Sequence, residues 1–219
     1  MDYLHLPVGQ IAARLPGASG VFQRYGIDFC CGGRTSLEDA IHRKKVDGAQ
    51  LVRDLIALEA RPGQGADWND MPIHDLLFHL RRDFHDRHRE QLPELIRLAK
   101  RVESVHGDRA DCPDGLAKLL KELMDELELH MQKEECVLFP MIGAGDSHAW
   151  MPMQIMEQEH DEHGHRLERL LAITNRGQPP EDACNTWRAL YAGIRSFAED
   201  LQQHIHLENN VLFPRVRGT

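Results

Sequence analysis

The chain has 219 residues, of which 42% are hydrophobic and 28% are charged, as in an ordinary globular protein. Its formal net charge of -9 at pH 7 excludes the basic face that a nucleic-acid-binding protein normally needs. No apolar run approaches the roughly 20 residues that span a bilayer, and the first residues lack the pattern of a signal peptide. The five cysteines, two of them adjacent, do not resemble a secreted disulfide framework. We therefore expect a cytoplasmic protein without nucleic-acid or membrane partners.

The first part of the chain carries short helical patterns. Apolar residues recur there at helical spacing, and no strand-like alternation of any length appears. The predicted helices span residues 8–15, 18–25, 36–43 and 47–60. A stretch rich in glycine and proline, RPGQGA, follows them. We expect a small helical domain over residues 1–60 and a linker over residues 61–71.

Four longer helical patterns follow this linker, and short segments that contain glycine, proline or aspartate separate them. They span roughly residues 72–104, 113–142, 150–175 and 181–213. Pro93 falls inside the first pattern and is expected to kink or split that helix. Four long helices with short connections predict an antiparallel up-down bundle over residues 72–219. The predicted fold class is therefore all-α, a four-helix bundle preceded by a small helical domain.

A pattern of histidine, glutamate and apolar residues occurs twice in the bundle region. His130 is followed by Glu134 and a Val-Leu-Phe-Pro run, and His204 is followed at the same spacing by Glu208 and the same run. Residues four positions apart share a helix face, and apolar residues occupy that face around both pairs. A carboxylate inside an apolar bundle is costly unless it is paired or bound to a cation. One such pair is usually part of a solvated face, but two copies in register predict a metal site.

A second element, His-Asp-x-His, lies upstream of each pair. It occurs at His85–His88 and at His160–His163, 75 residues apart. Imidazole and carboxylate ligands together suit iron, manganese or zinc. Both histidines of each element fall on the apolar side of their helix. The residues alone therefore leave open which histidine of each element is the ligand.

One histidine from each of four helices and two glutamates would supply six ligands. If both carboxylates bridge two metal ions, and a solvent-derived oxo or hydroxo group adds a third bridge, each metal is five-coordinate with one open position. Four neutral imidazoles and two carboxylates compensate the charge of two ferric ions poorly. We therefore expect a centre that holds iron loosely and is compatible with iron release.

Cys30 and Cys31 are adjacent in the sequence. Neighbouring Cα atoms are about 3.8 Å apart across a trans peptide, which is below the range that disulfides favour. We therefore expect two accessible thiols, with two buried small hydrophobic side chains as the alternative. Gly32 and Gly33 would let the backbone turn after them.

The residues after the two cysteines resemble the start of a helix. Thr35 and Glu38 have the spacing of a capping box, and Arg34 precedes them. A helix N-terminus and a nearby cation both favour a thiolate. The sequence thus predicts a lowered pKa for the cysteine thiols.

These motifs resemble the haemerythrin-like domain, a four-helix bundle with a non-haem di-iron centre. The segment FQRYGIDFCCGGR resembles the vicinal-cysteine domain fused to it in the Repair of Iron Centres family, of the ScdA or YtfE type. The resemblance runs essentially end to end. The runs HDRHREQLPEL and HMQKEECVLFP are its most specific parts.

The resemblance implies a particular set of site residues. The first histidine of each His-Asp-x-His element is the ligand, and both glutamates bridge. The implied metal ligands are His85, His130, Glu134, His160, His204 and Glu208. The implied cofactor is a pair of non-haem iron ions with an oxo or hydroxo bridge. Cys30 and Cys31 would relay iron or a nitrosyl group.

The resemblance also implies a function, the repair of iron-sulfur clusters damaged by nitrosative or oxidative stress. Such a protein would supply labile iron to damaged or apo iron-sulfur proteins, as an iron donor rather than a turnover enzyme. Nitric oxide or O2 would be its small ligands, and association into a homodimer stays open. Two alternatives are a di-iron nitric oxide reductase and a haemerythrin-like protein that binds or senses O2 or nitric oxide.

Overall fold

The structure, a computed structural model, describes residues 2–59 and 68–218. Helix dominates these residues, and they contain no strand, only an isolated bridge between Pro7 and Ser36. The all-α class is therefore confirmed. The linker expected at residues 61–71 falls mainly outside the described ranges, so the predicted domain boundaries stay a prediction. No helix within the described part of the chain combines the length and apolar character needed to cross a membrane.

The chain divides into two compact units, Met1–Leu77 with Gln202–Thr219, and Phe78–Leu201. The smaller unit contains α1 (Val8–Arg14), α2 (Ala18–Tyr25), α3 (Leu37–Lys44), α4 (Gly48–Glu59), most of α5 (Ile73–His79), the end of α10 (Asn185–Leu207) from Gln202 onward, η4 (Glu208–Leu212) and α11 (Phe213–Arg217). The first four helices agree with the predicted ranges to within one residue at each end. Their apolar faces share one core, which includes the fully buried side chains of Phe22, Phe29 and Leu37.

The start of α3 differs from the predicted capping box. Ser36 is the N-cap, and its hydroxyl oxygen accepts a hydrogen bond from the backbone N–H of Asp39 at 3.1 Å. The predicted capping box of Thr35 and Glu38 was therefore wrong by one residue. Two overlapping Ser/Thr-x-x-acid patterns occur in this segment, and sequence spacing alone cannot choose between them.

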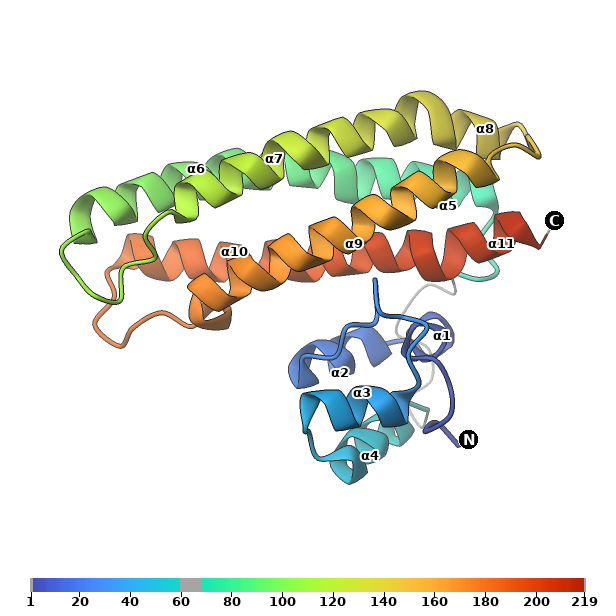
Figure 1. The fold of residues 1–219 in the computed structure, drawn as a ribbon, viewed down its shortest axis with the longest axis horizontal. Coiled ribbons are helices and arrows are strands. Elements are labelled where there is room, and N and C mark those ends of the chain that lie inside the picture. Colours follow the sequence, from blue (N-terminus) through green and yellow to red (C-terminus); the bar gives the residue numbers. More distant parts are fainter. Residues whose placement is uncertain (1, 60–67, 219) are drawn as a thin grey trace. The chain divides into compact units, whose positions relative to one another are not determined.

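The larger unit is built from long helices that run side by side (Figure 1). Its elements are η1 (Leu80–His85), α6 (Asp86–His106), α7 (Leu116–Lys133), η2 (Glu134–Leu138), α8 (Phe139–Gly143), α9 (Trp150–Ile173), η3 (Asn175–Gly177) and α10 (Asn185–Leu207) up to Leu201. α7 packs against both α6 and α9. α10 packs on α6, where Arg87 Nε lies 3.0 Å from Asp200 Oδ2. The antiparallel four-helix bundle is confirmed.

Pro93 does not split its helix, because α6 continues from Asp86 through Pro93 to His106. Within residues 2–59 and 68–218, three π-helical segments interrupt the regular α-helix elsewhere. η1 ends at His85, η2 begins at Glu134 and η4 begins at Glu208. Such π-segments are rare and are frequent at functional sites.

A proline follows two of these π-segments, and its chemistry explains why the helix widens there. Pro140 and Pro214 each lie in the first turn of the next short helix. A proline inside a helix lacks the N–H that would bond the carbonyl four residues earlier, and its ring crowds that carbonyl. The wider turn accommodates it, with the N–H of Phe139 donating to the carbonyl of Glu134 and that of Phe213 to the carbonyl of Glu208.

Candidate metal centre

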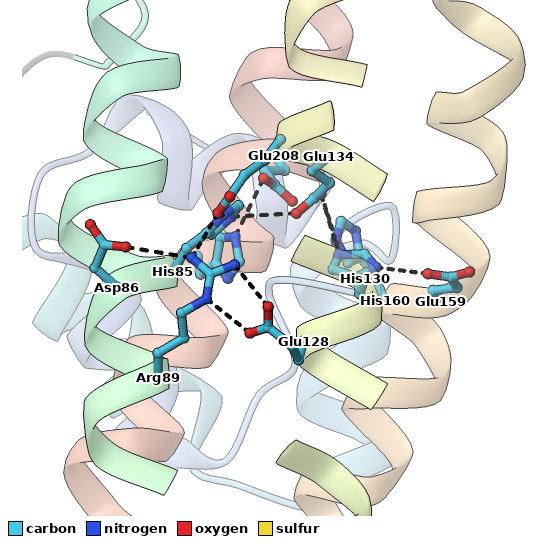
Figure 2. A network of polar contacts seen from close by, with 11 residues as sticks. His85, Asp86, Arg89, Glu128, His130, Glu134, Glu159, His160 and Glu208 are labelled. Atoms are coloured by element: carbon cyan, nitrogen blue, oxygen red, sulfur yellow. Dashed lines mark hydrogen bonds and ion pairs between the residues drawn. The ribbon is translucent and has the colours of Figure 1, made fainter. Parts of the chain in front are cut away.

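Four buried polar side chains meet inside the larger unit (Figure 2). His85 lies at the end of η1, His130 on α7, Glu134 at the start of η2 and His160 on α9. At most 1% of each residue is exposed. Each comes from the sequence motifs that predicted a metal site, and the fold brings them together.

Glu134 lies between the histidines. Its Oε2 is 3.3 Å from Nε2 of His85, and its Oε1 is 3.2 Å from Nε2 of His130 and 4.0 Å from Nε2 of His160. The Nε2 atoms of His130 and His160 are 3.1 Å apart. With metal–nitrogen bonds of about 2.1 Å, two ligands at right angles lie about 3.0 Å apart. The donor set therefore fits a cation on chemical and on geometric grounds.

Carboxylates on the outer side orient two of the imidazoles. Nδ1 of His85 donates to Oε1 of Glu135 at 2.9 Å, and Nδ1 of His130 donates to Oε2 of Glu159 at 2.9 Å. These hydrogen bonds hold the pKa of each glutamate at about 2, so both carboxylates are ionised acceptors. The Nδ1 protons leave the lone pair on Nε2, the atom that faces Glu134. Metal-bound histidines are commonly oriented in this way.

Cations in turn hold the outer carboxylates. Arg89 donates to Glu135 at 2.9 Å, and Lys133 donates to Glu159. Arg89 also donates to Glu128 at 2.8 Å (Figure 2). Sequence reasoning missed Glu135 and Glu159 as functional residues. Their only signal is position, since each is next to an expected ligand, Glu134 or His160.

The structure separates the two histidines of each His-Asp-x-His element. Within the described residues, the buried groups whose ligand atoms lie within 4.8 Å of one another include His85 and His160 but neither His88 nor His163. The ring of His88 packs edge-on against Phe197, and the ring of His163 packs edge-on against His130. Burial is the main cause that lowers the pKa of His163 to about 2.

His204 and Glu208 form a second buried pair, in the smaller unit. His204 lies near the end of α10, Glu208 opens η4, and Nε2 of the histidine is 3.4 Å from Oε1 of the glutamate. At most 1% of either residue is exposed. This pair repeats the arrangement of His130 and Glu134, as the sequence repeat predicts.

The two cysteines lie in the loop before α3, and all five cysteines of the chain are thiols rather than disulfides. Cys30 is buried, with 4% of the residue exposed, and Cys31 is half-buried. The expectation of two accessible thiols is therefore wrong for Cys30. The expected lowering of the thiol pKa is also wrong there. The hydrogen bond with Cys31, burial and the nearby Asp28 raise the pKa of the Cys30 thiol well above its ordinary value.

The end of the chain holds this loop in place. Asn210, on η4, donates from Nδ2 to the carbonyls of Phe29 and Cys30, both at 3.2 Å, and Asn209 donates to the carbonyl of Cys30 at 3.3 Å. His206 is buried and packs edge-on against Phe29.

Taken together, the fold and these donors define a helix-bundle protein whose buried histidines and glutamates can bind a cation. Comparison with known families agrees. The chain belongs to the haemerythrin HHE cation-binding domain family, whose model matches residues 76–216. A second family model, ScdA_N, described as a domain of unknown function, matches residues 5–59.

Relatives of similar length match this chain over essentially its whole length. The iron-sulfur cluster repair protein YtfE of Pectobacterium atrosepticum is 49% identical over 220 residues and covers 100% of both chains. YtfE of Musicola paradisiaca is 48% identical and covers 100% of this chain and 99% of its own. A probable iron-sulfur cluster repair protein of Haemophilus influenzae is 45% identical over 99% of this chain and 98% of its own.

Proposed function

We propose that this protein repairs damaged iron-sulfur clusters by donating iron from the buried histidine and glutamate side chains. The observation that carries the proposal is the Glu134 cluster, in which three imidazole Nε2 atoms face one fully buried carboxylate. The full-length similarity to proteins named for iron-sulfur cluster repair supports the same function. The clients are damaged or apo iron-sulfur proteins, and the site of action is the cytoplasm.

The resident metal in this proposal is a pair of iron ions. The proposed ligands are His85, His130, Glu134, His160, His204 and Glu208. The sequence repeat supports the inclusion of the last two, because His204 and Glu208 have the spacing and the burial of His130 and Glu134.

The charges around the donors favour release of the iron. Four imidazoles are neutral, and two carboxylates offset only part of the charge of two iron ions. The outer carboxylates of Glu135 and Glu159 would add negative charge, but Arg89 and Lys133 already pair with them. Such a donor set binds iron less tightly than a carboxylate-rich site, so iron is cargo that a client can accept.

The experiment is the restoration of a cluster in an apo iron-sulfur protein, with sulfide and a reductant present. The iron-loaded protein should restore the cluster faster than an equal amount of ferrous salt. A Glu134→Gln variant should lose this advantage, because the amide removes the central charge between the histidines. Glu94→Gln, which changes an exposed carboxylate on α6, should retain it. Equal rates for the wild-type protein and ferrous salt would contradict the proposal.

A further inference from the structure

We infer that Asp28, Cys30 and Cys31 form a second metal site, a mononuclear site for a divalent thiophilic cation. The three side chains form a compact group whose ligand atoms lie within 4.8 Å of one another. All of them belong to one loop of the smaller unit, between α2 and α3. The site deepens the proposed function, on which it rests for the identity of the cation as Fe²⁺.

The spacing of the donor atoms matches a tetrahedral ion. The two Sγ atoms are 3.7 Å apart, and Sγ of Cys30 is 3.4 Å from Oδ1 of Asp28. With metal–sulfur bonds of about 2.3 Å and metal–oxygen bonds of about 2.0–2.2 Å, the edges of a tetrahedron are about 3.8 Å for S···S and about 3.6 Å for S···O. One cation can therefore bind all three donors with shifts of a few tenths of an ångström.

The loop is organised before any cation arrives. Oδ1 of Asp28 accepts hydrogen bonds from the backbone N–H groups of Cys30 and Cys31 at 3.2 and 3.0 Å, and Oδ2 accepts one from Gly32 at 2.9 Å. These bonds fix the carboxylate beside the thiols. Asn210 holds the carbonyls on the other side of the loop. Little side-chain or backbone freedom is left to lose when a cation binds.

Without a cation, the same group favours protonated, neutral thiols. A buried thiol beside a second thiol and a carboxylate resists ionisation, as the raised pKa of Cys30 reflects. A divalent cation reverses this balance, because thiolates are the form that binds metal. Binding of one cation to two thiols and one carboxylate releases two protons to solvent and transfers no electrons. Asp28 is exposed, so the site is open to solvent and to a further ligand.

Two thiolates select for thiophilic ions such as Zn²⁺ or Fe²⁺ over Mg²⁺ or Ca²⁺. Asn210, which holds the loop, lies two residues after Glu208, one of the ligands in the proposed function, on η4. The loop would therefore hold a single iron ion between its release from the buried centre and its transfer to a client.

The test uses the full-length, iron-loaded protein with reduced thiols, titrated with Co²⁺ as the optical probe. We expect one cobalt ion per chain with a thiolate-to-cobalt charge-transfer band, two protons released per cobalt, and competition by Fe²⁺. Cys30→Ser and Cys31→Ser should remove the band. Asp28→Asn should weaken cobalt binding at least tenfold. Asp47→Asn, which removes one carboxylate from the same domain and retains an N-cap side chain for α4, should leave it unchanged.

A measurement on the wild-type protein covers the case in which a variant fails to fold. Bound Co²⁺ or Zn²⁺ should protect both Cys30 and Cys31 from alkylation, as mass spectrometry can show. Absence of the band, or an affinity that Asp28→Asn does not change, overturns the metal site. If cobalt does not bind while cluster restoration still exceeds that with ferrous salt, the metal site fails and the repair function stands. If cobalt binds but the protein restores the cluster no faster than ferrous salt does, the metal site stands and the repair function fails.

Discussion

At the scale of single residues, the buried centre depends on groups that would not touch the metal. Glu135 and Glu159 accept hydrogen bonds from the Nδ1–H groups of His85 and His130. These bonds place the Nε2 lone pairs toward Glu134. Loss of such outer hydrogen bonds typically costs 10–100-fold in metal affinity. The two glutamates are therefore positioning residues rather than ligands.

Glu135→Gln and Glu159→Gln should each speed the transfer of iron to a chelator by about 10–100-fold, because an amide can also present its N–H₂ group to the ring and loses the charge that fixes the tautomer. Stopped-flow mixing with a ferrous chelator measures the rate. Glu94→Gln serves as the control. Unchanged rates in both variants would show that these carboxylates do not position the histidines.

Position 33 requires glycine because other atoms lie too close for a side chain. The backbone flexibility that the sequence suggested is not the reason. A Cβ atom at this position would lie 2.5 Å from Oδ1 of Asn210 and 2.9 Å from the carbonyl oxygen of Phe29. Gly33 is not among the glycines with positive φ. The space for a side chain is taken by the asparagine that holds the loop.

Gly33→Ala should lower the free energy of unfolding by about 1–3 kcal/mol, the usual cost of an overpacked position. Urea denaturation followed by circular dichroism measures this. Gly20→Ala is a matched control, because no atom lies within 4 Å of a Cβ added at this position. Gly20 is inside α2, where alanine stabilises the protein by about 0.5–1 kcal/mol relative to glycine. A stable Gly33→Ala protein would mean that the loop accommodates the methyl group elsewhere.

At the scale of elements, η4 combines two tasks within three residues. It begins with Glu208, and it presents Asn209 and Asn210 to the cysteine loop. A change in this short element therefore affects both Glu208 and the hydrogen bonds that hold the cysteine loop.

Asn210→Asp should expose Cys30, because the carboxylate cannot donate to the carbonyls of Phe29 and Cys30. In the wild-type protein iodoacetamide should modify half-buried Cys31 before buried Cys30, and modification of Cys30 should rise only as the pH exceeds its ordinary thiol range. In Asn210→Asp the Cys30 rate should rise several-fold. Mass spectrometry of timed samples tells the two sites apart.

Asn209→Asp, which removes the hydrogen bond from Asn209 to the carbonyl of Cys30, should have a smaller effect. An unchanged Cys30 rate in both variants would show that these asparagines do not hold the cysteine loop in place.

At the scale of the whole molecule, the strongly periodic parts were predictable from the sequence. The spacing of apolar residues predicted the long helices. The doubled His/Glu pattern predicted polar residues on their buried faces, where a carboxylate is costly unless it is paired or bound to a cation. The π-segments were not predictable, because hydrophobic periodicity does not register one extra residue in a turn. Nor was the burial of Cys30, because its loop is held by Asn209 and Asn210, which lie about 180 residues away in the sequence.

The choice between the histidines of each His-Asp-x-His element shows the same limit. His85 and His88 are both buried, and helical periodicity gives them equal standing. The structure distinguishes them by their neighbours, Glu134 and Glu135 for the first, Phe197 and Gln91 for the second. Such tertiary contacts are absent from any local pattern.

The central claim is that the buried histidines and glutamates hold two iron ions as one centre. Elemental analysis of the purified protein, with and without the His204→Ala substitution, tests it most directly. We predict two iron ions per wild-type chain and a loss of at least one in the variant. A single zinc ion per chain, or an iron content that His204→Ala does not alter, would contradict the claim.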